Sequence, residues 1–148
     1  MAKKDQHNYE KDFYAWAIYN ARLLREGKLS EVDIENIAEE IESMGRSERR
    51  ELINQLTVLL AHLLKWEFQP ERKTHSWKYT IKEQRSRVEE LLQDSPSLKK
   101  SLTENLNQAY ENSISIAAGE TGLTEKKFPK KCPYSLKEAL NKDFFPGG

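Results

Sequence analysis

The chain has 148 residues, of which 37% are hydrophobic and 32% are charged, and its 24 basic residues balance its 24 acidic ones. This length suits one ordinary domain with a core that needs no metal or disulfide. A net charge of zero argues against a surface made throughout for nucleic acid or anionic membrane. The single cysteine, Cys132, excludes a disulfide scaffold. We interpret it as an inert thiol, because no nearby base would activate it.

The sequence gives no sign of targeting or of a membrane span. The N-terminal residues lack the apolar stretch of a signal peptide, and residues 1–7 are polar, so we expect them to be frayed. The longest apolar run, 58–64, is far shorter than a membrane-spanning helix. We therefore expect a cytoplasmic protein without membrane contact.

The first two predicted helices follow from apolar periodicity. Apolar side chains recur every three or four residues over 8–26, which predicts a helix that Gly27 ends. Ser30, with Asp33 three residues later, indicates the start of a second helix. We expect this helix to turn one apolar stripe toward the core, formed by Ile34, Ile37, Ala38, Ile41 and Met44.

Residues 47–69 carry the strongest helical pattern, because six leucines between 52 and 64 cover a broad arc. So wide an arc predicts a central helix that contacts several neighbours. The stripe of 34–44 stays roughly in phase with this arc, so one helix over 31–69 is an alternative. We favour a break at Gly45, since Ser47 suits the cap of a new helix.

The second half of the chain also predicts helices. A helix over 75–93, a helix that Ser95-Pro96 starts and that ends near Gly119 or Gly122, and a loop over 123–134 follow in order. Ser135 and Glu138 form a capping box for a short helix over 135–142. The prediction is an all-α, single domain over 1–148, a bundle of five or six helices around residues 47–69.

Several motifs together resemble one family. They are Asp12-Phe13 to Trp16, Ile37 to Glu42 with Gly45, His62 to Trp66, Trp77 with Arg85, Ser95-Pro96-Ser97-Leu98, and Phe128-Pro129 to Cys132-Pro133-Tyr134. In this order, from about Tyr9 to Pro146, they resemble the bacterial, cyanobacteria-rich family called domain of unknown function 29. The resemblance implies a helical fold and a bacterial cytoplasmic protein. It carries no catalytic role onto any residue.

Glu39, Glu42 and His62 are the candidate catalytic and metal-binding residues. Glu35, Glu39 and Glu42 share a helix face, and carboxylates held in this way bind Mg²⁺ or Mn²⁺. His62 lies among leucines, either as a general base or metal ligand beside these glutamates or as a structural histidine with satisfied nitrogens. The Glu-x-x-His pattern of di-iron proteins is missing. We predict no cofactor, and a divalent metal only if the chain is a metal-dependent enzyme acting on phosphodiesters.

A second set of candidates is basic and aromatic. The candidate binding residues are Arg46, Arg49, Arg50, Trp77, Lys78, Lys82 and Arg85. Cations interleave with aromatics over 72–87, as in proteins that grip phosphates and stack bases. Acidic residues are mixed through the same segment, which is typical of a helix with a charged face toward water.

The motifs of common enzyme classes are missing from the sequence. It has no Gly-rich phosphate loop, no Gly-x-Ser-x-Gly, no Cys-x-x-Cys and no His-Glu-x-x-His. The leading interpretation is therefore a non-enzymatic helical module that binds another protein or itself. A metal-dependent phosphodiester enzyme and a nucleic-acid-binding protein are the alternatives.

Overall fold

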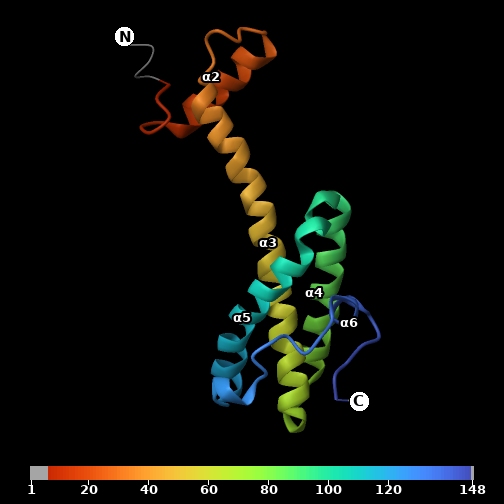
Figure 1. Cartoon of the computed structure of the whole chain (residues 1–148). Helices are drawn as coiled ribbons and strands as arrows, with labels where there is room; N and C mark the ends of the chain where they lie inside the picture. The colour runs from red at the N-terminus through yellow and green to blue at the C-terminus, as the bar shows by residue number, and fades with distance from the viewer. Residues whose placement is uncertain (1–6, 148) are drawn as a thin grey trace. The chain divides into compact units, whose positions relative to one another are not determined.

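The structure is a computed structural model that describes residues 7–147 (Figure 1). Over this range it contains five α-helices, three short 3₁₀ helices and no β-strand, which confirms the all-α prediction. None of the described helices is long and apolar enough to cross a membrane. The expected fraying of residues 1–7 falls, apart from His7, outside the described residues.

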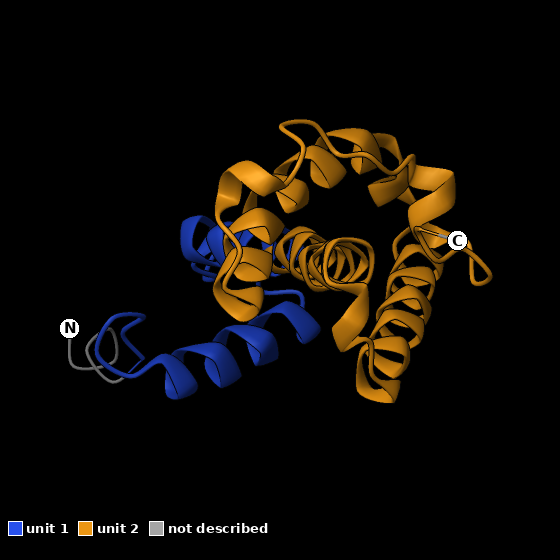
Figure 2. Cartoon of the chain, turned by 90° about the horizontal axis from the view of Figure 1, so that it is seen from below, with its two compact units in different colours: residues 1–46 blue, residues 47–148 orange. Residues whose placement is uncertain are grey.

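The chain divides into two compact units (Figure 2). Residues 1–46 form the N-terminal unit and residues 47–148 form the C-terminal unit. The α-helices are α2 (Phe13–Arg25), α3 (Ile34–Phe68), α4 (His75–Asp94), α5 (Leu102–Thr121) and α6 (Leu136–Leu140), and the 3₁₀ helices are η1 (Pro70–Arg72), η2 (Pro96–Ser101) and η3 (Glu125–Lys127). The single domain over 1–148 stays a prediction.

Most predicted helix ends lie close to the observed ones. Gly27 ends α2 with a positive φ of 72°, and Lys28 N donates to Leu23 O at 2.9 Å, as in a Schellman motif. The capping box of α6 is confirmed, since Ser135 and Glu138 each accept from the backbone N–H of the other. The first helix begins at Phe13 rather than at residue 8, because Asp12 is its N-cap. Only η3 interrupts the expected loop over 123–134.

The predicted break at Gly45 is wrong, because α3 is one helix from Ile34 to Phe68. The positive-φ glycines are Gly27, Gly122 and Gly147 among the described residues, so Gly45 keeps a helical backbone. A glycine inside a helix costs about 1 kcal/mol relative to alanine. The good helix formers on either side, Met44, Arg46 and Glu48, offset that cost.

The start of α3 also differs from the prediction, because Asp33 and not Ser30 caps it. Asp33 Oδ1 accepts from Asn36 N at 3.4 Å, and Asp33 O accepts from Ile37 N at 2.9 Å. Aspartate is as good an N-cap as serine. The Asp33 carboxylate also accepts hydrogen bonds from the side chains of Trp16 and Asn36, which favour Asp33 over Ser30 as the cap.

The C-terminal unit has a core centred on α3, as the leucine arc predicts. Its fully buried leucines are Leu52, Leu56, Leu59, Leu60, Leu63 and Leu64. They belong to one cluster with Ile81 and Val88 of α4, Ala109 and Ala117 of α5, and Phe128. In Figure 1, α4 and α5 lie beside this part of α3. The prediction of a central helix is therefore confirmed for residues 47–68.

Arg85 holds the C-terminal segment onto α4. Its side chain is only 2% exposed, and its Nε and Nη2 donate to Ala139 O at 2.8 Å and to Phe144 O at 2.7 Å. Two longer bonds of 3.5 Å reach the carbonyls of Glu138 and Lys142. Burial lowers the pKa of Arg85 to about 10, against an opposing effect of Asp143. The guanidinium therefore satisfies carbonyls that a helix as short as α6 leaves unpaired.

We expect Arg85→Leu to lower the free energy of unfolding by about 3 kcal/mol, because it leaves buried carbonyls without donors. Urea denaturation followed by circular dichroism measures this loss. Arg87→Leu is the matched control, since Arg87 is exposed and pairs with Glu83 of its own helix, and its effect should stay within about 0.5 kcal/mol. Equal losses in the two variants would contradict the role given to Arg85.

Candidate functional site

The candidate metal ligands are held in different surroundings. Glu39 and Glu42 pair with Arg46 at 2.8 and 3.6 Å, and their side chains are 57% and 69% exposed. His62 belongs to the C-terminal unit, and its Nδ1 lies 2.9 Å from the carbonyl oxygen of Val58. Across residues 7–147, no group of three or more His, Cys, Asp or Glu side chains is placed to hold a metal. The metal-dependent enzyme stays a prediction that no observation favours.

His62 has the surroundings of a structural histidine. Burial lowers its pKa, and the Val58 carbonyl opposes this effect. The nearby cation Lys65 lowers the pKa further, while Glu120 raises it. Lys65 is itself buried, where it pairs with Glu120 at 2.7 Å. The lowered pKa and the bond to the Val58 carbonyl are consistent with the structural histidine, which is one of the two alternatives drawn from the sequence.

The basic and aromatic candidates are largely engaged within the chain. Trp77 is half-buried, and Lys65 Nζ lies 4.6 Å from its ring centroid. Lys78 Nζ lies 5.8 Å from the ring of Phe145, and Arg85 is buried as described above. Arg49 Nε donates to Asn105 Oδ1 at 3.3 Å, while Arg50 and Lys82 are exposed. Nucleic-acid binding through these residues also stays a prediction without a supporting observation.

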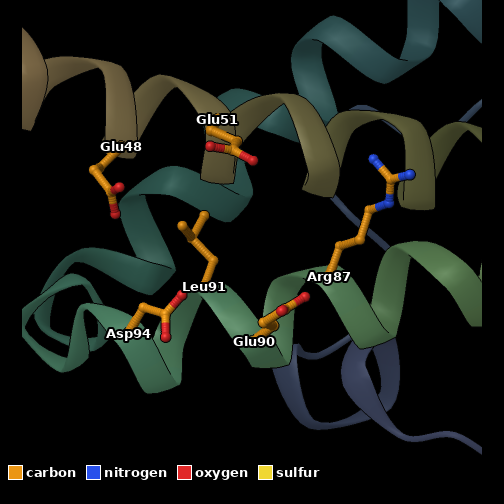
Figure 3. A pocket seen from close by; sticks show the side chains of 6 residues that line it. All are labelled: Glu48, Glu51, Arg87, Glu90, Leu91 and Asp94. Atoms are coloured by element: carbon orange, nitrogen blue, oxygen red, sulfur yellow. The ribbon is translucent and has the colours of Figure 1, made fainter.

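A cavity between α3 and α4 was not predicted from the sequence. Its volume is about 460 Å³, and the residues that line it are Glu48, Glu51, Arg87, Glu90, Leu91 and Asp94 (Figure 3). Arg87 pairs with Glu83, which does not line the cavity, and Glu48 accepts from Ser95 Oγ at 2.9 Å. Glu48 and Glu51 are three residues apart on α3, and Glu90 and Asp94 are four apart on α4, so each pair shares a helix face. This spacing is the sequence signal that could have predicted the cavity. The carboxylates form no metal-binding group.

Polar side chains join α2 to the start of α3 in the N-terminal unit. Asp33 Oδ2 accepts from Trp16 Nε1 at 2.9 Å and from Asn36 Nδ2 at 2.7 Å. Asn20 Oδ1 accepts from Asp33 N at 2.8 Å, and Asn20 Nδ2 donates to Trp16 O at 2.9 Å. The bonds from Asn36 and Trp16 lower the pKa of Asp33, although burial opposes them. We call Trp16, Asn20, Asp33 and Asn36 the polar clasp.

Tyr9 extends this contact along α3. Its hydroxyl donates to Glu40, and its ring packs edge-on against Trp16 with centroids 4.7 Å apart. The hydrogen bond to Glu40 raises the pKa of Tyr9 to about 12, because a phenolate would lie beside a carboxylate. Asp33, Asn36 and Glu40 thus share one side of α3, at positions i, i+3 and i+7, and this side contacts Trp16 of α2 and Tyr9 just before α2.

The polar contact leaves the apolar stripe of α3 in water. We call Ile34, Ile37, Ala38, Ile41 and Met44 the α3 stripe. Three of its members, Ile34, Ile41 and Met44, are 65%, 59% and 62% exposed. The expectation that this stripe faces the core is therefore wrong, because the clasp turns the polar side of the helix toward α2. Only Ile37 is half-buried.

Exposed apolar side chains gather on the N-terminal unit. Within residues 7–46 the large exposed ones are Phe13, Tyr14, Ile18, Leu24, Leu29, Ile34, Ile41 and Met44, whereas residues 47–147 contribute Tyr79 and Ile116. The buried residues of 7–46 are Trp16, Asn20 and Leu23. Among them, Ile34, Ile41 and Met44 share one face of α3, and an exposed apolar face of this kind is typical of an interaction site. It is the candidate functional site of the chain.

The fold and this surface define an all-α protein whose described residues, 7–147, bring together no group of three or more His, Cys, Asp or Glu side chains that could hold a metal. The chain belongs to the family described as domain of unknown function DUF29, whose model matches residues 8–145. The family resemblance drawn from the sequence motifs is thereby confirmed. No curated protein matches the chain. No solved structure matches it either.

The lowered pKa of His62 gives a prediction about stability against pH. The unfolded chain binds the proton with the ordinary pKa of about 6.5, and the folded chain binds it more weakly, so stability falls as pH drops below about 6.5. We expect His62→Gln to flatten the change in urea midpoint between pH 7.5 and pH 5.5. The exposed His75→Gln is the matched control and should leave that change as it is. An unaltered slope in His62→Gln would contradict the assignment.

Proposed function

We propose that the chain is a non-enzymatic interaction module that binds a protein through the apolar surface of its N-terminal unit. The exposure of the α3 stripe carries this proposal. Three large side chains at 59–65% exposure on one helix face are costly to leave in water, and burying each one fully is worth about 2 kcal/mol. A partner that covers them recovers this free energy.

The location of the protein is part of the same proposal. We infer a bacterial, cyanobacteria-type protein that acts in the cytoplasm from the motif resemblance and from the N-terminal residues, which lack the apolar stretch of a signal peptide. Fractionation of the source cells tests this, because recovery in the membrane or external fraction would count against it.

The test of the proposed function compares two surface variants. Ile41→Asp places a charge in the α3 stripe, and Tyr79→Asp places one on an equally exposed aromatic of α4. We expect affinity chromatography from a source lysate to yield a partner with wild type and with Tyr79→Asp, and to lose it with Ile41→Asp. A buried, unpaired carboxylate should weaken the purified complex about 100-fold.

Circular dichroism at matched concentration shows whether each variant remains folded. A protein retained equally by Ile41→Asp would show that binding does not use this surface. If neither a foreign partner nor self-association is found with wild type, the proposed function is wrong.

A further inference from the structure

We propose that a further cavity, in the C-terminal unit, binds a small organic phosphate, meaning a phosphate monoester with an apolar body. This cavity has a volume of about 640 Å³ and lies between α5 and residues 130–136. In Figure 1, the segment that contains these residues leads from the end of α5 back to α6. The site goes beyond the proposed function, because the protein-binding surface lies on residues 7–46.

Apolar side chains line this cavity from both sides. Leu106 and Tyr110 come from α5, and Tyr134 and Leu136 come from the facing segment. Leu106, Tyr110 and Tyr134 are buried, so packing holds them in place. Small-molecule sites measure about 300–1,000 Å³ and combine apolar walls with a few polar groups. A bare phosphate ion would leave these walls uncovered, so the ligand needs an apolar body.

Two lysines supply the charge that an anion needs. Lys130 and Lys131 line the cavity, together with one carboxylate, Glu111. Both lysines are exposed, and neither forms an ion pair with the residues that the structure describes. A phosphate monoester carries about 1.5 to 2 negative charges at pH 7, and lysine binds phosphate as a point charge. Two adjacent cations therefore match a phosphate monoester better than a carboxylate, which carries one charge.

The backbone that carries these lysines is held in place by its neighbours. We call residues 126–131 the lysine loop, because they include four lysines and no carboxylate. Phe128 of this loop is buried and packs edge-on against Phe68, with ring centroids 5.3 Å apart. The Tyr110 hydroxyl donates to Pro129 O at 2.5 Å. A loop that is already ordered loses little conformational freedom on binding, so more of the contact energy becomes affinity.

The phenol and the thiol in the wall stay neutral near pH 7. Burial raises the pKa of Tyr110 to about 12, and burial also raises the pKa of Cys132. A phenolate or a thiolate would repel an anion, whereas the neutral groups do not. The cavity between α3 and α4 differs in this respect, because four carboxylates line it beside Arg87. An organic phosphate therefore suits the cavity beside the lysine loop and not the acidic one.

Isothermal titration calorimetry of the full chain with naphthyl phosphate tests the proposal, and naphthol and inorganic phosphate are the comparison probes. We expect naphthyl phosphate to bind at one site with a dissociation constant below about 1 mM. Naphthol and inorganic phosphate should each bind at least about tenfold more weakly, because each makes only one kind of contact. No binding of naphthyl phosphate, or equal binding of inorganic phosphate, would overturn the proposal and leave the protein-binding surface unaffected.

Variants of the lysine loop separate the cavity from the charge of the loop as a whole. Lys130→Ala combined with Lys131→Ala removes the two cations that line the cavity, and should weaken binding at least about tenfold. Lys126→Ala combined with Lys127→Ala removes two exposed cations that do not line it, and should weaken binding no more than about twofold, since salt screens distant charges. Equal losses in the two double variants would show attraction to the loop in general and would overturn the site.

Variants of α5 test the facing wall. Glu111→Gln removes the carboxylate of the cavity and should tighten binding about threefold. Asn107→Trp fills the cavity from an exposed position and should abolish binding, whereas Gln108→Trp, which is exposed but does not line the cavity, should bind like wild type. Circular dichroism shows whether each variant remains folded. Unchanged binding in a folded Asn107→Trp would place the ligand elsewhere.

Cys132 reports whether the cavity is occupied, because it is the one cysteine of the chain and lines the cavity. Dithiodipyridine, an uncharged thiol reagent, measures how fast it reacts. Saturating naphthyl phosphate should slow this reaction at least about fivefold in wild type, since the bound ligand blocks access to the thiol. The variant without Lys130 and Lys131 should show no protection at the same ligand concentration. A thiol that reacts equally fast at saturation in wild type would overturn the proposed site.

Discussion

The hydrogen bonds of Asp33 are the interaction on which the N-terminal unit depends. One carboxylate caps α3, accepts from the indole of Trp16 and accepts from the amide of Asn36. Its position fixes the rotation of α3 relative to α2 within this unit, so that the polar side of α3 faces inward. A helix can turn only one side toward a neighbour, so the α3 stripe, which lies on the adjacent side, is turned away from α2. A part-buried polar contact thus leaves an apolar face exposed.

Sequence periodicity predicted much of the fold but misjudged the environment of α3. The leucines of 52–64 are numerous enough that only a buried core accommodates them, and they are buried. The stripe that includes Ile34 and Ile41 has the same period, yet it is exposed. Periodicity shows that a face is apolar, but it does not show whether the cover comes from the same chain. Contacts at a distance, such as Trp16 with Asp33, decide that question.

The candidate sites were harder to predict because some of the basic side chains in this chain are buried and bind partners within the protein. Lys65 and Arg85 read as ordinary surface charges, yet they are 6% and 2% exposed. Each is buried with partners more than 50 residues away, Glu120 for Lys65 and the carbonyls around α6 for Arg85. A sequence pattern of basic and aromatic residues cannot separate a cation that contacts a ligand from one that contacts its own aromatic rings. Within 72–87, Lys73, Lys78 and Arg85 are of the second kind, since each lies against an aromatic ring of its own chain.

The small core and the apolar surface of the N-terminal unit have one physical consequence. If covering the α3 stripe supplies part of the burial that folds this unit, binding and local folding are linked equilibria. The free energy of local unfolding then depends on partner concentration in the N-terminal unit but not in the C-terminal unit, which has its own leucine core. Hydrogen exchange of α2 amides would therefore slow as partner is added, while amides of α4 and α5 would keep constant rates. The same apolar side chains would thereby determine both where the protein binds and where it is stable.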